Sequence, residues 1–280
     1  MQTKTPQRRS IRLTRRGRIA LVATTAAVIG SVVALPVVLS GEQVEEPTSL
    51  TIPVGWRAEQ VYTAIDKVLA LRSGTTKKEL PAMKLPLPAE AKGNPEGYLF
   101  PATYPTTEDS TPRLLLSRMV DATNEELRAA PLAAGANSAQ QNGYRTVTIA
   151  SIVQAESGGT ADMGKVARVI HNRMQQEMPL QLDSTIDYVR GQNTGQTENH
   201  NAPLDNPYNT YARPGLPPTP ISSPSKEAMR AAIAPTPGDW LYFVTVKSGD
   251  TRFTAEYQEH QRNVAELKEN RQRAAASASP

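Results

Sequence analysis

Residues 146–177 read TVTIASIVQAESGGTADMGKVARVIHNRMQQE, and this stretch decides the fold of the central part of the chain. Apolar residues recur three and four positions apart on both sides of Gly158 and Gly159, which predicts two helices in tandem with a glycine break between them. Thr160 is expected to cap the second helix at its start. The apolar stripe of that helix consists of Met163, Val166, Ala167, Ile170 and Met174.

Glu156 stands at the end of the first of these two helices. Ile149, Ile152 and Val153 precede it by seven, four and three residues, so a helix places all four side chains on one face. Burial on that face and the negative end of the helix dipole would both raise the pKa of the carboxyl, as a general acid at neutral pH requires. The pattern fits equally a glutamate at a frayed helix end that leans into water.

Two further acids follow the tandem helices in QLDSTIDY, residues 181–188. Asp183 and Asp187 are the nearest partners for a glycosidase that uses two carboxylates. Both residues, like Asp162, can also be interpreted as capping residues of helices or turns. None of the three is therefore assigned a direct acid role.

The loop DNPYNTYARPGLPPTPIS, residues 205–222, sets Tyr208 and Tyr211 among amides and prolines. This composition suits stacking on a sugar ring, and it suits a stiff structural loop equally well. No GxSxG nucleophile motif occurs, and the histidines show no metal-ligand spacing, so the sequence predicts neither a serine hydrolase nor a catalytic metal. The histidines are His171, His200 and His260.

The flanking segments predict a mixed α+β fold. Residues 240–246 and 252–255 are typical of two strands of a hairpin, and residues 256–267 of a helix. The long stretch 181–223, rich in Pro, Asn and Gly, is expected to be a functional loop. Upstream, Thr111-Pro112 marks the start of another helix.

A small strand-turn-helix unit is expected over residues 49–71, followed by an irregular connector rich in Pro, Lys and Gly. A domain boundary is placed at the end of this connector. The predicted organisation is a basic cytoplasmic tail at 1–18, a transmembrane helix at 19–39, a linker and small βα unit at 40–95, the main domain at 96–270 and a disordered tail at 271–280.

The N-terminal 39 residues predict a membrane anchor. Seven Lys or Arg and no acid occur in the first 18 residues, and residues 19–39 carry no charge. As a helix this run spans roughly 30 Å, which matches the hydrocarbon core of a bilayer. A cleaved signal peptide is the alternative, although its apolar region is usually shorter. The positive-inside rule keeps the N-terminus in the cytoplasm and sends the rest of the chain outside.

The overall charge of +4 does not indicate nucleic-acid binding. Once the seven leading basic residues are set aside, the rest of the chain carries three more acids than bases. No clustered basic and aromatic pattern for phosphate binding occurs in it. The absence of cysteine excludes disulfides and thiolate metal sites, so stability has to come from an ordinary core.

Six motifs occur in one order along the chain: EGYLFPATY at 96–104, ASIVQAESG at 150–158, VARVIHNRM at 166–174, PLQLDSTIDY at 179–188, NPYNTYARPGLPPTPIS at 206–222, and LYFV at 241–244 ahead of Glu259-His260. Together they resemble the signature of the YceG-like endolytic murein transglycosylases. The resemblance covers roughly residues 50–267. It departs from the family at QLDST, where QTDPT is more typical, and in the unit at 50–71, which stands where many relatives have a longer LysM-like region.

The resemblance implies a membrane-anchored lyase that cuts the bond between N-acetylmuramic acid and N-acetylglucosamine in nascent peptidoglycan strands. Such an enzyme leaves 1,6-anhydro ends and limits strand elongation. Glu156 matches the family's catalytic acid and base, and Gln154 stands where members often have a second Glu. The matching candidates for lining the glycan groove are Glu96, Asn172, Gln181, Asp183, Tyr208, Asn209, Thr210 and Tyr211.

The resemblance implies no cofactor or metal. The expected partners are peptidoglycan strands, the membrane and cell-wall synthases. Two other functions stay open from the residues: a non-catalytic scaffold that binds the cell wall, and a muramidase that uses water as nucleophile.

Overall fold

The computed structural model describes residues 48–129, 142–191 and 205–278, which all belong to one compact unit, Glu45–Pro280. The predicted basic tail, transmembrane helix and first part of the linker lie outside the described residues. Within the described ranges no helix combines the length and apolar character needed to cross a membrane. The predicted mixture of helices and strands is confirmed.

The N-terminal half is built on a two-stranded antiparallel sheet and three helices. Strand β1 (Ser49–Thr51) pairs with β2 (Thr103–Pro105), and helices α1 (Ala58–Val68), α2 (Thr75–Glu79) and α3 (Pro112–Ala129) accompany it. One core joins residues from both sides of position 95, among them Leu50, Val61, Ile65, Leu99, Leu115 and Met119. The segments before and after residue 96 thus share apolar packing, which suits a three-residue strand and one helix that bury too little apolar surface to fold alone.

The predicted connector at 73–95 is more regular than expected. It contains α2 and two short 3-10 helices, η1 (Leu80–Ala82) and η2 (Ala89–Ala91). Asp66, a buried residue of α1, fixes the first turn of α2. Its carboxylate accepts hydrogen bonds from the Gly74 N–H at 2.7 Å and from the Thr76 N–H at 2.9 Å. These bonds satisfy orphan donors at the start of α2.

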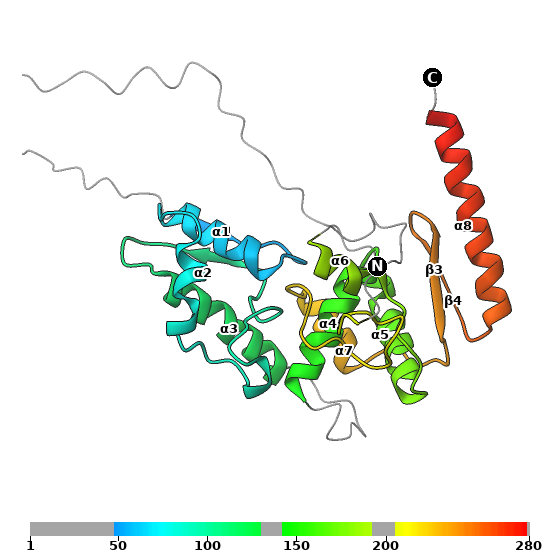
Figure 1. The fold of residues 1–280 in the computed structure, drawn as a ribbon, viewed down its shortest axis with the longest axis horizontal. Coiled ribbons are helices and arrows are strands. Elements are labelled where there is room, and N and C mark those ends of the chain that lie inside the picture. Colours follow the sequence, from blue (N-terminus) through cyan, green and yellow to red (C-terminus); the bar gives the residue numbers. More distant parts are fainter. Residues whose placement is uncertain (1–47, 130–141, 192–204, 279–280) are drawn as a thin grey trace, which may run out of the picture. The chain divides into compact units, whose positions relative to one another are not determined.

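Four helices form the second core. They are α4 (Gly143–Glu156), α5 (Thr160–Gln175), α6 (Asp183–Arg190) and α7 (Lys226–Ile233), and α4 contacts the other three (Figure 1). Residues 146–153 of α4 are all buried, which is expected of a helix surrounded by protein. The predicted tandem helices are confirmed. The predicted cap Thr160 is wrong, because Gly159 occupies the cap position and Thr160 is already helical.

Helices α6 and α7 were not predicted from the sequence. Each has eight residues, and α6 lies within the stretch expected to be a loop. Isolated helices of this length are marginal in water, so their stability comes from packing that the local sequence does not reveal.

The C-terminal part consists of a hairpin and a long helix. Strands β3 (Tyr242–Lys247) and β4 (Asp250–Thr254) pair antiparallel, and α8 (Tyr257–Ala278) lies against both (Figure 1). The predicted hairpin and helix are confirmed. The prediction of disorder over 271–280 is wrong for residues 271–278, which continue α8 and include the strong helix former Ala in several positions.

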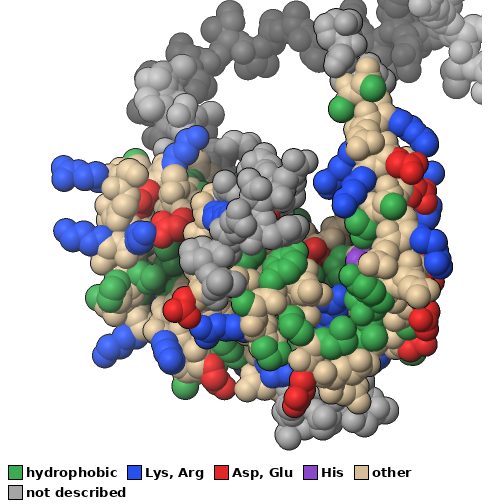
Figure 2. Space-filling view, turned by 45° about the vertical axis from the view of Figure 1, so that its right-hand side comes forward, with side chains coloured by type: hydrophobic (Ala, Val, Ile, Leu, Met, Phe, Trp, Pro, Cys, Tyr) green, Lys and Arg blue, Asp and Glu red, His purple; other side chains and the backbone are tan. Residues whose placement is uncertain are grey.

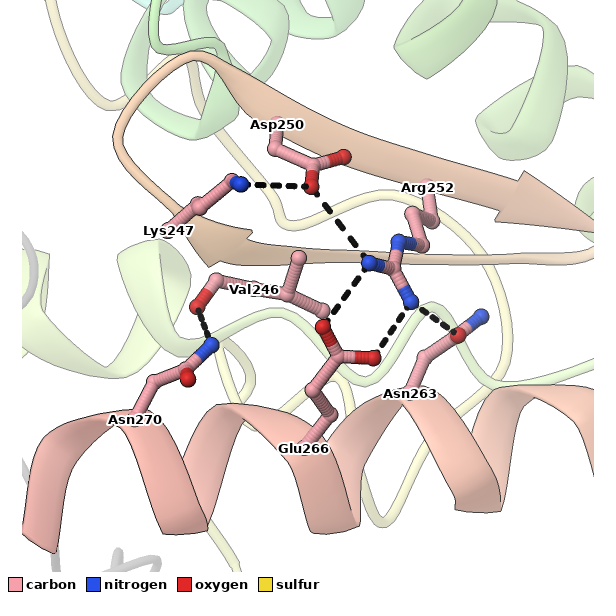
Figure 3. A network of polar contacts seen from close by, with 7 residues as sticks. All are labelled: Val246, Lys247, Asp250, Arg252, Asn263, Glu266 and Asn270. Carbon is pink, nitrogen blue, oxygen red and sulfur yellow. Dashed lines mark hydrogen bonds and ion pairs between the residues drawn. The ribbon is translucent and has the colours of Figure 1, made fainter. Parts of the chain in front are cut away.

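A polar network fixes one face of α8 to the hairpin (Figure 3). The guanidinium of Arg252 donates to both carboxylate oxygens of Glu266, at 2.6 and 2.9 Å, and to Asn263 Oδ1 at 3.1 Å. One turn further, Asn270 donates to the Val246 carbonyl at 3.0 Å. Because Asn263, Glu266 and Asn270 share a face of α8, these bonds set the rotation of the helix about its axis.

Candidate active site

Glu156 is the last residue of α4, and its side chain is half-buried. The predicted face is present, since Ile149, Ile152 and Val153 are buried beside it in the second core. The chain leaves the helix in an extended conformation at Ser157, so α5 starts in a new direction. This break leaves the Glu156 carboxyl group at the edge of the core, where a cavity opens.

Burial raises the pKa of Glu156 above its usual value, as predicted. Hydrogen bonding from Ser184 opposes this shift, and its N–H donates to Glu156 Oε1 at 3.4 Å. The negative charges of Asp183 and Asp187 raise the pKa further. A carboxyl group whose proton is held more tightly in this way can act as a general acid nearer to neutral pH.

The first turn of α6 brings Asp183 and Ser184 to Glu156. The hydroxyl of Tyr211 donates to Asp183 Oδ1 at 2.7 Å. Thr210 Oγ1 accepts from the Leu182 N–H at 3.1 Å, and so the loop that carries Tyr211 also fixes the start of α6. Asp187, one turn further along the helix, is fully buried. Of the two predicted acid partners, only Asp183 faces the cavity at Glu156.

Arg173 of α5 organises the same wall and was not predicted from the sequence. Its buried guanidinium donates to the carbonyls of Leu241 at 2.6 Å and Leu180 at 2.9 Å, and to Gln181 Oε1 at 2.9 Å. Charge-assisted hydrogen bonds of this kind are stronger than neutral ones. The signal was present, because Arg173 stands seven residues after Val166 and therefore on the apolar stripe of α5.

Glu156 opens onto a groove of about 910 Å³. One wall comes from the end of α4 and the segment 180–184, and the other comes from β3 and α8. Hydrophobic side chains gather at the foot of α8, and Lys and Arg side chains stand higher on the helix (Figure 2). The aromatic lining residues are Tyr211, Tyr242, Phe243 and Tyr257.

The structure divides the predicted groove residues into three groups. Gln181, Asp183 and Tyr211 line the groove together with Glu156. Asn209 and Thr210 are buried behind it, where Asn209 Oδ1 accepts from the Tyr211 N–H at 3.1 Å. The other predicted residues, Asn172, Glu96 and Tyr208, are absent from the lining of this groove.

Asn172 and Tyr208 make contacts of a structural kind. The Asn172 amide donates to the carbonyls of Gly238 at 3.2 Å and Trp240 at 2.9 Å, and so holds the segment that enters β3. The Tyr208 hydroxyl is 2.7 Å from Thr219 Oγ1, and its ring lies 5.2 Å from that of Tyr188. The expected sugar-gripping role of Tyr208 therefore does not fit the Glu156 groove.

Glu96 lies beside a different cavity of about 630 Å³, which Tyr208 also lines. Glu96 is 4% exposed, and its carboxylate accepts the Ala58 N–H at 3.1 Å and the Tyr188 hydroxyl at 3.2 Å. Burial raises its pKa to about 7, although these hydrogen bonds oppose the shift. Glu96 thus ties the start of α1 to α6.

We expect Glu96→Gln to remove a pH dependence of stability. Since folding raises the pKa of Glu96 from 4.5 to about 7, protonation favours the folded state. The stabilisation that comes from protonated Glu96 is fully present below its unfolded pKa of 4.5, and it is lost as the pH rises through its folded pKa of about 7. Relative to the Gln variant, the free energy of unfolding of the wild type should fall by about 3 kcal/mol across this window.

Urea unfolding at a series of pH values measures this difference. Glu125→Gln, at an exposed position of α3, provides the control and should follow the wild type. Parallel pH profiles for the wild type and Glu96→Gln would contradict the assignment.

His171 and His260, the two histidines that the structure describes, belong to no metal site there. Across residues 48–129, 142–191 and 205–278, no group of three His, Cys, Asp or Glu side chains could hold a metal ion. His171 Nε2 lies 3.1 Å from the Ala232 carbonyl, and His260 lines the groove with its ring 5.1 Å from that of Tyr242. His200 is outside the described residues.

Comparison with known proteins gives a consistent family. The model of the YceG-like family matches residues 31–266. An endolytic murein transglycosylase of Bacillus subtilis is 34% identical over 166 residues, which are 59% of this chain and 46% of that protein. An endolytic murein transglycosylase of Streptococcus pneumoniae is 32% identical over 258 residues, which are 80% of this chain and 46% of that protein. The chain thus spans about half the length of these curated relatives.

A solved structure agrees with the fold. The crystal structure of a yceG-like protein from Listeria monocytogenes superimposes with a TM-score of 0.62 at 27% sequence identity. The match covers 77% of this chain and 75% of that one.

Proposed function

The chain belongs to the YceG-like family, and from this we propose that it is an endolytic murein transglycosylase that cleaves the glycan strands of peptidoglycan. The observation that carries the proposal is Glu156, a half-buried carboxyl with a raised pKa on the wall of a groove. The groove also presents aromatic side chains, which suit the faces of sugar rings.

In the proposed reaction Glu156 acts first as acid and then as base. Its carboxyl proton passes to the glycosidic oxygen as the bond from that oxygen to C1 of N-acetylmuramic acid breaks. The C6 hydroxyl of the same sugar then attacks C1 and gives its proton to the Glu156 carboxylate. The new C6–O–C1 bond closes the 1,6-anhydro ring, no water is consumed, and the carboxyl is restored.

An internal nucleophile makes a second catalytic carboxylate unnecessary, and it has the entropic advantage of a preplaced reactant. Asp183 still has a role in this scheme. Its negative charge lies near Glu156 and would stabilise the positive charge that develops on the sugar at C1. Since Asp183 accepts the Tyr211 hydroxyl, its position in the groove is fixed.

Asp183 is also the observation that favours a second candidate, a muramidase in which this carboxylate activates water. The two candidates differ in their products. Digestion of purified sacculi in heavy-oxygen water, followed by mass analysis, should yield 1,6-anhydro ends without the heavy isotope. Labelled reducing ends would instead indicate hydrolysis, and no cleavage at all would leave the non-catalytic scaffold.

We further propose that residues 19–39 anchor the protein as a single-pass helix with the N-terminus in the cytoplasm and the groove outside, near the cell-wall synthases. Support comes from the absence of charge in this run and the seven basic residues before it. The measurement is a carbonate wash of membranes. We expect the full chain to stay in the washed membranes and a chain without residues 1–39 to be lost from them.

We also propose that the unit at 50–71 is a reduced LysM-like region. Glycan binding by variants in its exposed residues tests this proposal.

A further inference from the structure

The face of α8 that lines the groove is a single helical stripe. Its central members recur at intervals of three and four residues: Tyr257, His260, Val264, Lys268 and Arg271. Gln261, Ala265 and Leu267 line the groove beside them. The network of Arg252, Glu266 and Asn263 holds a different face of the helix against the hairpin (Figure 3). The rotation of α8 is therefore fixed with this stripe toward the groove.

The chemistry of the stripe changes along the helix. At its start Tyr257 and His260 pack around Tyr242 of β3, with ring centroids 5.5 and 5.1 Å from that of Tyr242. Two turns later the lining side chains are Lys268 and Arg271. At 1.5 Å per residue, Arg271 lies roughly 10 Å beyond Val264 along the helix axis. An aromatic part of the wall is thus followed by a basic part.

The two basic side chains are available for a ligand. Both are exposed, and within the part of the chain that the structure describes neither forms an ion pair or a side-chain hydrogen bond. Other basic residues nearby are engaged, since Arg252 pairs with Glu266 and Arg273 with Glu269. The opposite wall carries the acids Glu156 and Asp183. An anionic group in this groove would avoid the acidic wall and bind at the basic pair.

We propose that Lys268 and Arg271 form a subsite for a carboxylate of the substrate, namely a free carboxyl group on the peptide stem of a muramic acid residue in the groove. The inference rests on the proposed function, because it takes peptidoglycan as the substrate. Arginine and lysine both bind carboxylates by charge-assisted hydrogen bonds. The subsite would make cleavage depend on the peptide as well as on the glycan.

The test compares Lys268→Glu/Arg271→Glu with Lys78→Glu/Arg118→Glu in the full chain. The control pair also replaces one lysine and one arginine, at exposed positions outside the groove, so the change in net charge is the same. The substrates are purified glycan strands whose stem carboxyls are either free or converted to amides. Initial rates of 1,6-anhydro end formation give kcat and KM for each combination.

We expect the groove variant to raise KM on the free-carboxyl strands by about tenfold while kcat stays unchanged, since the pair binds substrate away from the reacting bond. Amidation should raise KM of the wild type by a similar factor, and it should lower KM of the groove variant, because the two introduced glutamates repel a free carboxyl but not an amide. The wild-type advantage on free-carboxyl strands should shrink as salt is added.

Equal KM values for the groove variant and its control would overturn the subsite, as would a groove variant that still binds free-carboxyl strands better than amidated strands. The groove variant could instead lose binding to vesicles that contain phosphatidylglycerol while its KM for strands stays unchanged. This result would overturn the subsite and would show that Lys268 and Arg271 bind a membrane surface. If the charge-reversal variant fails to fold, Lys268→Gln/Arg271→Gln carries the same comparison.

Failure of the proposed function gives a different result, because the wild type would then form no 1,6-anhydro ends on either substrate. In that case equilibrium binding of fluorescently labelled strands, free against amidated, still tests the subsite. Weaker binding of amidated strands by the wild type, but not by the groove variant, would support it. Equal binding of both strands by the wild type would overturn it.

Discussion

Glu156→Gln is expected to reduce the formation of 1,6-anhydro ends by about a thousandfold, because the amide can neither give a proton to the glycosidic oxygen nor take one from the C6 hydroxyl. The substitution keeps the shape of the side chain, and the amide oxygen can still accept the Ser184 N–H. Mass analysis of digested sacculi measures the loss. Glu125→Gln, at an exposed position of α3, should keep full activity.

The loss of activity should come without a loss of stability. Because folding raises the pKa of Glu156, its ionisation above the usual carboxyl range opposes the folded state. A neutral glutamine avoids this cost, so the variant should unfold at the same temperature as the wild type or a higher one near neutral pH. Such an exchange of stability for activity is common at catalytic groups. More than a tenth of wild-type activity in a folded Glu156→Gln protein would contradict the assigned role.

Gly97→Ala is expected to lower the free energy of unfolding by about 2–5 kcal/mol, a large part of the roughly 5–15 kcal/mol of a typical domain. Gly97 has φ +80°, a left-handed conformation that costs any residue with a side chain. A Cβ at this position would also lie 2.7 Å from Pro220 Cγ and 2.9 Å from Val147 Cγ1. The first effect is strain of the backbone, and the second is overpacking between the two halves of the core.

Gly93→Ala separates these two effects. Gly93 has φ +81°, almost the same φ as Gly97, but a Cβ there would meet no atom within 4 Å. This variant should lose only the strain, about 1–2 kcal/mol. Urea unfolding of both variants gives the difference, which measures how tightly Pro220 and Val147 are held. If the two variants lose equal stability, the close packing at Gly97 carries no energetic weight.

Local periodicity predicted the helices around Glu156 well. The stripe of α5 and the face of α4 follow from a repeat of three and four residues, which a helix imposes whatever surrounds it. Arg173 could have been found in the same pattern. An arginine on an apolar face has to satisfy its donors inside the protein, and here it does so on carbonyls of residues that follow the helix.

Other parts of the site depend on contacts between residues that are distant in sequence, and local patterns could not predict them. The start of α6 is fixed by Thr210, 28 residues after Leu182. Tyr208 and Tyr211 are close in sequence, yet the turn at Asn209 sends them to different cavities. Glu96 was grouped with the groove on the strength of its motif, although its hydrogen bonds to α1 and α6 place it beside the second cavity. Motifs identified these residues without indicating which wall each one joins.

The two walls of the groove are encoded by separate, continuous segments of the chain. The wall that carries the Glu156 carboxyl lies mainly within residues 156–184, and the opposite wall within residues 242–271. Substitutions in α8 can therefore alter which strands are held without disturbing Glu156, its pKa or the start of α6. Mutational drift in the last helix would diversify the ligands that the groove prefers, while the surroundings of Glu156 are inherited unchanged.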